Sequence, residues 1–298
     1  MESEGVTGYR RIEGIYRGEP LHMVGDGFRV STYFPSDHIS AARISPFILL
    51  DYHLPHSYPP AGGRRRGVGP HPHRGFETVT IAYEGSIAHR DSAGNGGVIN
   101  PGDVQWMTAA SGIVHQEYHE TEFARQGGVM HMIQLWVNLP RADKMSPPKY
   151  QALLSEQMGT VDLPDRGGVV RVIAGEFNGA RGPASTFTPI NLWDLRLNAG
   201  GTAEFTLPQG QTAALLALGG EVKVNDTEFV RARDFVMFEN GDGRIKLEAA
   251  ENSILLLLGG EPIAEPVVQY GPFVMNTEEE IYQAVEDYRS GRMGAIGL

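Results

Sequence analysis

The chain of 298 residues contains no cysteine. Disulfide bonds, a thiolate nucleophile and a cysteine-ligated zinc or iron–sulfur site are therefore excluded, so any bound metal must use nitrogen and oxygen ligands. Long apolar runs are also missing, because the most apolar stretch, Ile254–Leu258, is far too short to span a bilayer. Residues 1–10 are polar and lack the apolar segment of a signal peptide. We therefore expect a cytoplasmic protein that does not enter a membrane.

Positive charge is scarce as well, since the formal net charge is −11 at pH 7. Phosphate contacts need a surplus of lysine and arginine on one surface, so direct nucleic-acid binding is not expected. The run Arg64-Arg65-Arg66 is the local exception, and three cations in a glycine-rich loop are more often solvated than bound to phosphate. An acidic surface suits a basic protein partner better than DNA. No heptad or other interface pattern is present, which favours a monomer.

Glycine (38 residues) and proline (19 residues) are plentiful and separate short β-branched runs. This pattern is typical of an all-β sandwich or barrel with few helices. A chain of 298 residues with 41% hydrophobic content can form one large or two medium domains, each with its own core. The clearest predicted strands cover residues 78–83, 133–137, 169–173, 215–218 and 253–258.

Two stretches carry apolar residues at helical spacing. Pro148–Met158 lies between the two β-rich halves and is predicted to be a linking helix. Near the end, Asn276-Thr277 has the character of an N-cap, three glutamates follow it, and apolar residues recur at helical spacing as far as Tyr288. The chain is therefore expected to end on a helix packed against a barrel.

A weak internal repeat divides the chain. The segment from Ile81 to Gly85 and the segment from Leu216 to Gly220 are both an apolar strand ending in glycine, and each is followed by a hairpin and an aspartate that opens the next strand. The repeat predicts two copies of one barrel, residues 1–145 and 146–298. All ten histidines lie at or before His131, so only the first barrel can hold a histidine site.

Two short motifs of the first half carry metal-binding side chains. His71 and His73 are two residues apart, and residues two apart on an extended strand project from the same face. His115 and Glu117 repeat this arrangement. If the two strands are neighbours in a small barrel, three imidazoles and one carboxylate meet at a common point. The alternative is that the four residues are unrelated polar groups in loops or satisfied core positions.

Three imidazoles and a carboxylate suit first-row divalent metals, and on an octahedral ion they leave two positions open for substrate, water or dioxygen. This arrangement follows the logic of non-haem iron oxygenases. Glu77 shares parity with His71 and His73, so it is expected to face inward, either as an acceptor that orients an imidazole or as an exchangeable ligand. A structural or surface role is expected for the remaining candidates, His89, His119 and His131.

The same residues carry a family resemblance. The segments 70–80, 100–109 and 112–117 resemble the signature of the pirin family, within the cupin superfamily. Segments 46–51, 133–140 and 271–277 are also similar to pirins, so the resemblance spans most of the chain. It implies two tandem cupin (jelly-roll-like) β-barrels, the second of which has lost its metal.

The resemblance also implies site residues. Carried over position by position, the iron ligands of the family fall on His71, His73, His115 and Glu117, while Glu77 occupies the glutamate position of the general cupin pattern. One divalent metal ion is therefore expected, Fe(II) first, although Mn, Ni, Co, Cu and Zn accept the same ligands.

Two kinds of function follow from the resemblance. Some pirins resemble flavonol 2,3-dioxygenases, which cleave quercetin with dioxygen, and here Glu117 or Glu77 would act as the base that takes the flavonol proton. Other pirins are similar to iron-dependent regulatory proteins that bind a transcription factor or a metabolic enzyme without turnover. An enzyme whose small substrate is not a flavonoid is a third possibility.

Overall fold

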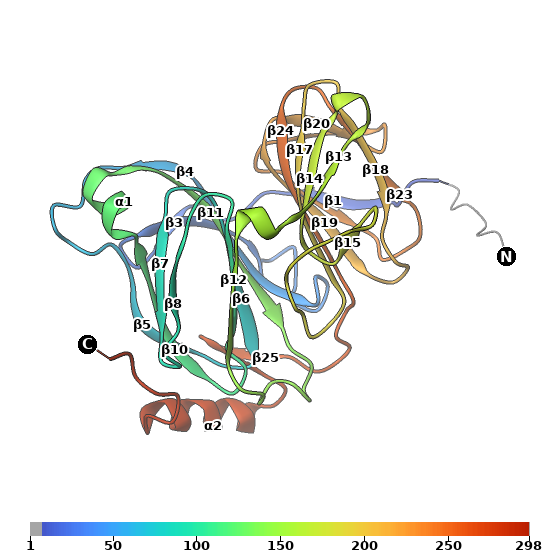
Figure 1. The fold of residues 1–298 in the computed structure, drawn as a ribbon. Helices are drawn as coiled ribbons and strands as arrows, with labels where there is room; N and C mark the ends of the chain where they lie inside the picture. Colours follow the sequence, from blue (N-terminus) through green and yellow to red (C-terminus); the bar gives the residue numbers. More distant parts are fainter. Residues whose placement is uncertain (1–7, 298) are drawn as a thin grey trace. The chain divides into compact units, whose positions relative to one another are not determined.

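The computed structural model describes residues 8–297, so most of the polar segment 1–10 lies outside the described residues. The strands are divided between two compact units. We call the unit formed by Glu19–Glu156 with the segment from Ile263 onward the histidine barrel, and the unit formed by residues up to 18 with Gln157–Pro262 the apolar barrel. Figure 1 shows that both are built almost wholly of strands, as the sequence predicts.

The histidine barrel contains two antiparallel sheets. The large sheet has the order β12-β9-β6-β11-β4-β3-β2 and the small sheet the order β5-β10-β7-β8. The large sheet comprises β2 (His22–Val24), β3 (Phe28–Phe34), β4 (Phe47–Tyr58), β6 (Phe76–Glu84), β9 (Val104–Thr108), β11 (Gly128–Asn138) and β12 (Lys149–Leu153). The small sheet comprises β5 (Gly67–His73), β7 (Ile87–Asp91), β8 (Gly96–Ile99) and β10 (Ile113–His119), and the short helix α1 (Thr121–Gln126) follows β10. Ile87 and Ile99 of the small sheet share one core cluster with Met130 and Met132 of the large sheet, so the two sheets pack face to face.

The apolar barrel repeats this plan. Its large sheet has the order β1-β22-β19-β24-β17-β14-β13 and its small sheet the order β18-β23-β20-β21. The large sheet comprises β1 (Ile12–Tyr16), β13 (Gly159–Asp162), β14 (Gly168–Ala174), β17 (Ile190–Leu197), β19 (Thr212–Gly219), β22 (Phe235–Phe238) and β24 (Ser253–Gly260). The small sheet comprises β18 (Thr202–Thr206), β20 (Glu221–Val224), β21 (Glu228–Arg231) and β23 (Arg244–Ala249), and β15 (Glu176–Phe177) pairs with β16 (Ala180–Arg181).

Equivalent rows in the two large sheets carry different chemistry. In the histidine barrel Thr80 of β6 lies opposite Gln134, which lies opposite Asp51. In the apolar barrel the row is Leu215, Leu257 and Trp193, all buried in one hydrophobic cluster. The positions match because the repeat in the sequence aligns Ile81 with Leu216, so the barrel without histidine has an apolar interior.

The two ends of the chain do not follow the division predicted at residue 145. β1 pairs with β22 and so belongs to the apolar barrel, while the last segment belongs to the histidine barrel. That segment contains β25 (Val268–Tyr270), β26 (Phe273–Met275) and the predicted helix α2 (Glu278–Arg289), in which Thr277 and Glu280 form the capping box. The helix buries Ile281 and Ala284 against Val114, so it packs on the histidine barrel (Figure 1).

The helix predicted over Pro148–Met158 is wrong. Lys149–Leu153 is strand β12, which pairs with β9 and places Tyr150 opposite Met107, and only the turn Ser155–Gln157 is helical, of the 3₁₀ type. The edge of β9 offers unpaired backbone N–H and C=O groups, and satisfying them outweighs a local helical spacing. Within residues 8–297 no helix has the length and apolar character that crossing a membrane requires.

Candidate metal centre

The three predicted imidazoles come together on adjacent strands of the small sheet. β5 and β10 are antiparallel neighbours, with His115 directly opposite His71 and Ile113 opposite His73. One ring nitrogen from each of His71, His73 and His115 lies within 4.8 Å of the other two. The ring centroids are 4.3 Å apart for His71 and His115 and 4.8 Å apart for His73 and His115. The i, i+2 spacing thus delivers the predicted convergence.

The protonation of these rings fits metal binding. Burial lowers the pKa of both His73 and His115 well below the usual range, and the neighbouring imidazoles lower it further, so both rings are neutral at pH 7. Nδ1 of His71 lies 2.8 Å from the carbonyl oxygen of Gly69, which places its proton there and leaves Nε2 with a free lone pair. Nε2 of His115 is buried and has no hydrogen-bond partner among residues 8–297. Because such an orphaned acceptor is costly, the donor set suits a metal ion.

Glu117 sits beside this trio but belongs to a second group. A β-bulge separates His115 from Glu117 along β10, and a Glu117 oxygen lies within 4.8 Å of ring nitrogens of both His115 and His89. Its Oε1 also accepts a hydrogen bond of 3.3 Å from Thr80 Oγ1 of the opposite sheet. The four predicted ligands therefore fall into two overlapping groups that share His115.

A cavity of 250 Å³ opens onto the histidines. His71, His73 and Glu117 form part of its lining, and the other polar side chains there are Asp51 and Gln134. The rest of the wall is apolar and consists of Val24, Phe28, Val30, Val68, Met132, Trp136 and Pro272. A mostly apolar cavity with a few convergent polar groups is the usual form of a small-molecule site.

Two family models match this chain. The family model for pirin matches residues 27–137, and the model for the pirin C-terminal cupin domain matches residues 192–294. The chain belongs to the pirin family. A Pseudomonas aeruginosa protein provisionally named quercetin 2,3-dioxygenase is 52% identical over 283 residues, which are 95% of this chain and 98% of that protein. Human pirin is 39% identical over 258 residues, 85% of this chain and 84% of that protein.

The fold of this pirin-family chain also matches solved structures. A crystal structure titled quercetin 2,3-dioxygenase from Acinetobacter baumannii superposes with a TM-score of 0.92 at 44% sequence identity. The match covers 97% of this chain and 100% of that one. The prediction of two tandem cupin barrels with a C-terminal helix is therefore confirmed.

Two further residues lie beside the candidate ligands: His89, for which the sequence predicted a structural or surface role, and Asp91, which the sequence analysis did not single out. His89 and Asp91 lie on β7, the other neighbour of β10, where His89 is opposite Glu117 and Asp91 is opposite His115. Both side chains are fully buried. The i, i+2 alternation that identified His71 and His73 is present in His89-Arg90-Asp91 as well, and it was the available signal. The structural roles predicted for His119 and His131 agree with their hydrogen-bonding contacts, to the Gly27 carbonyl and the Tyr52 hydroxyl respectively.

Glu77 does not face the histidines, contrary to the expectation from its parity. Oε1 of Glu77 accepts a hydrogen bond of 2.6 Å from Thr108 Oγ1. Thr80 lies three residues after Glu77, so its side chain is on the opposite face of β6, and that is the face from which its hydroxyl contacts Glu117. Parity fails because Gly75, at φ +88°, turns the chain from the small sheet into the large one. Burial raises the pKa of Glu77 to about 7, although the bond from Thr108 opposes the rise.

Proposed function

We propose that this chain is a metal-dependent dioxygenase of the quercetin 2,3-dioxygenase type. One non-haem ion, Fe(II) first among the candidates, would be held by His71, His73, His115 and Glu117. The observation that carries the proposal is the convergence of three imidazoles, two of which, His71 and His73, line a largely apolar cavity. The resemblance in sequence and fold to proteins named for this activity supports the same reaction.

Each part of the cavity has a task in this reaction. A bound iron ion would supply Lewis acidity and dioxygen chemistry. The apolar wall, including Trp136, would bind the flat rings of a flavonol and exclude water. Glu117 would take the proton of the flavonol hydroxyl, and Thr80 holds that carboxylate toward the interior. Asp51 and Gln134 offer acceptors for the remaining hydroxyls of the substrate.

The test is anaerobic mixing of Fe(II)-loaded protein with quercetin, followed by admission of air. The flavonol absorption should disappear only after air enters, and mass spectrometry should detect the ring-cleavage product. A His115→Ala protein treated in the same way should leave quercetin unchanged. Absence of turnover with every one of Fe, Mn, Co, Ni and Cu would contradict the proposal.

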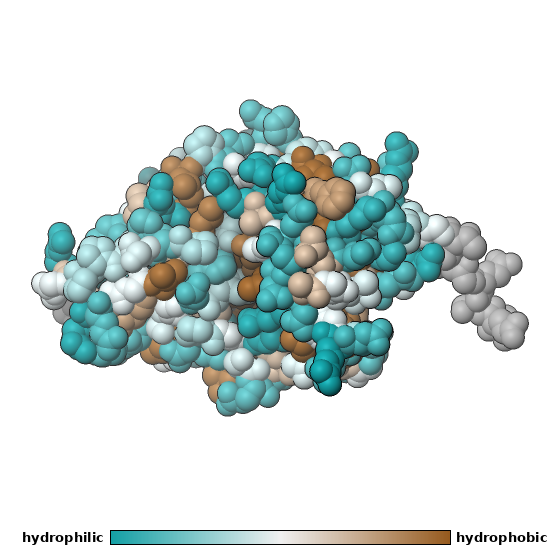
Figure 2. Space-filling model, turned by 90° about the horizontal axis from the view of Figure 1, so that it is seen from above, coloured by the Kyte–Doolittle hydropathy of each residue, from teal (hydrophilic) through white to brown (hydrophobic). Residues whose placement is uncertain are grey.

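A regulatory function without turnover is the second candidate, and the net charge of −11 favours it because an acidic surface attracts a basic protein partner. On the face shown in Figure 2, the apolar residues lie in small separate groups among hydrophilic ones, so charge would contribute more than apolar contact to binding there. Affinity capture from cell lysate with the iron reduced and then oxidised separates the two functions. A stoichiometric partner retained in one redox state would favour regulation.

A further inference from the structure

We propose that Asp91 and His89 form a hydrogen-bonded relay that sets the tautomer of His115, so that its Nε2 lone pair is free for a metal ion. The inference rests on the proposed metal site, but its central claim concerns the metal-free protein. His89 and Asp91 are thereby positioning residues that act on the ion through His115.

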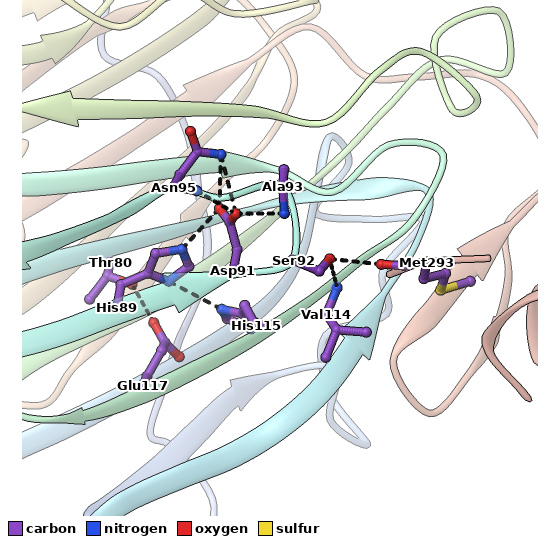
Figure 3. A network of polar contacts seen from close by, with 10 residues as sticks. All are labelled: Thr80, His89, Asp91, Ser92, Ala93, Asn95, Val114, His115, Glu117 and Met293. Atoms are coloured by element: carbon purple, nitrogen blue, oxygen red, sulfur yellow. Dashed lines mark hydrogen bonds and ion pairs between the residues drawn. The ribbon is translucent and has the colours of Figure 1, made fainter. Parts of the chain in front are cut away.

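The relay is a chain of two contacts on one face of the small sheet. Nδ1 of His115 lies 3.4 Å from Nδ1 of His89, and Nε2 of His89 lies 3.3 Å from Oδ2 of Asp91 (Figure 3). The pairing of β7 with β10 puts the three side chains on the same face. His89 and Asp91 have no exposed side-chain surface and His115 is fully buried, so water does not compete for these contacts.

The direction of hydrogen-bond donation along the relay follows from Asp91, the residue at its end. An ionised carboxylate can only accept, so Nε2 of His89 carries a proton and donates it to Asp91. Nδ1 of His115 faces Nδ1 of His89, so the single proton of the neutral His115 ring has an acceptor when it lies on Nδ1. Nδ1 of His89 is then the acceptor, and the His89 proton lies on Nε2. A neutral His115 protonated at Nδ1 has its lone pair on Nε2, the buried atom that has no hydrogen-bond partner in the described part of the chain. The Gly69 carbonyl selects the equivalent tautomer of His71.

Asp91 is itself held firmly. Its Oδ1 accepts backbone N–H bonds from Ala93 at 2.9 Å and from Asn95 at 3.0 Å, and the Asn95 side chain donates to both carboxylate oxygens (Figure 3). Burial alone would raise the pKa of Asp91, but the bonds from His89 and Asn95 hold it below its usual value, so the group is ionised.

Ser92, which follows Asp91, ties the turn to strand β10. Ser92 Oγ accepts a bond of 3.0 Å from the backbone N–H of Val114, which directly precedes His115, and donates to the Met293 carbonyl at 2.7 Å. Hydrogen bonds therefore tie the turn after Asp91 to β10, so the outer partner is held beside the candidate ligand.

Asp91→Asn reverses the relay with little change in shape. Because two backbone N–H groups already occupy Oδ1, that atom must remain an oxygen, and the new amide nitrogen takes the place of Oδ2. It would donate to Nε2 of His89, so that Nδ1–H of His89 donates to His115 and moves the His115 proton to Nε2. The Asn95 amide can rotate to present its oxygen to the new group.

The first measurement is ¹⁵N NMR of metal-free protein labelled at histidine. The expected result is His115 protonated at Nδ1 in the wild type and at Nε2 in Asp91→Asn. A wild-type His115 protonated at Nε2, or a tautomer unaffected by the substitution, would overturn the proposal. Since neither metal nor substrate is present, failure of the dioxygenase proposal leaves this test unaffected.

The second measurement is the affinity for Co(II), determined by competition with a chromophoric chelator. Asp91→Asn should weaken binding about 10- to 100-fold, the usual effect of removing an outer partner of a ligand. Asp103→Asn is the matched control, because Asp103 is also buried and accepts backbone N–H bonds but contacts no imidazole in the described hydrogen bonds. Wild-type affinity in Asp91→Asn would refute the relay.

His89 variants distinguish positioning from direct ligation. His89→Leu removes the acceptor for His115 and should weaken Co(II) binding, while His89→Gln restores an acceptor oxygen and should recover most of the affinity. Both should leave the Co(II) absorption spectrum in the wild-type form. A spectrum showing the loss of one nitrogen ligand would mean that His89 binds the ion itself, and the proposal would be wrong.

Discussion

Nη2 of Arg74 lies 2.7 Å from Oδ2 of Asp287, although 213 residues separate the two along the chain. Arg74 directly follows the candidate ligand His73, at the end of β5, so this ion pair ties helix α2 to the end of that strand. The side chains of Arg74 and Asp287 are 5% and 12% exposed. Asp287 also accepts hydrogen bonds from Gln283 and Arg292, which together with Arg74 overcome the effect of burial and lower its pKa to about 2.

Asp287→Ala should destabilise the protein by about 3 to 5 kcal/mol, because it leaves the Arg74 charge buried without its partner. Urea unfolding at pH 7 measures the loss. Glu286→Ala is the matched control, since the neighbouring Glu286 pairs with Arg289 at 3.5 Å on the exposed side of the same helix and should change stability by no more than about 0.5 kcal/mol. Equal effects of the two substitutions would show that the buried pair does not hold the helix in place.

Glu77→Gln should remove part of the pH dependence of stability. The folded-state pKa of Glu77 is about 7 against 4.5 for the free group, so between these values the folded protein holds a proton that the unfolded chain has lost. Stability therefore falls as the pH rises through this window and is level above it. The glutamine is neutral at every pH and keeps the acceptor for Thr108. It should match wild type near pH 4.5 and exceed it by about 3 kcal/mol at pH 8.

Urea unfolding at several pH values between 4.5 and 8 checks this slope. Glu84→Gln supplies the control, because the Glu84 side chain is 54% exposed. Parallel stability curves for wild type and Glu77→Gln would mean that Glu77 is ionised in the folded protein at pH 7.

The candidate ligands could be found from sequence because the necessary information is local. Residues two apart on a regular strand share a face, which places His71 with His73 on β5. His115 and Glu117 share a face of β10 as well, because both pair in regular register with β7. The neighbouring strand is not a local property. That β7 lies on the other side of β10, and so brings His89 and Asp91 to His115, depends on strand order.

The errors have the same origin. Counting parity from His73 to Glu77 ignored the turn at Gly75, where the chain changes sheet. Helical spacing over Pro148–Met158 was outweighed by pairing with the edge of β9. The capping box of α2 could be predicted because Thr277 and Glu280 are only three residues apart. The surface that the helix covers could not, because it is set by Val114 and Asp287, whose partners are distant in sequence.

His71→Ala and His115→Ala should each reduce the metal content of the purified protein. Each substitution removes one nitrogen of the three-imidazole group, and the loss at His115 should be greater because that residue belongs to both groups of candidate ligands. Elemental analysis of protein purified without added metal measures the effect, and it also identifies the ion. His38→Ala alters an exposed histidine and should leave the metal content unchanged. Full occupancy in a double His71→Ala/His115→Ala variant would exclude the proposed centre.

Val24→Trp should weaken flavonol binding without affecting the metal. Val24 is half-buried on the edge strand β2 and lines the cavity. A tryptophan there would fill the part of the cavity in which the substrate rings are proposed to bind, while the protein core stays intact. Quercetin affinity, measured anaerobically from the change in flavonol absorption on binding, should fall at least about tenfold, which corresponds to about 1.4 kcal/mol. Met23→Trp is the matched control, because Met23 precedes Val24 on the same strand and is 49% exposed. If Val24→Trp bound quercetin as tightly as Met23→Trp, the substrate would have to bind outside this cavity.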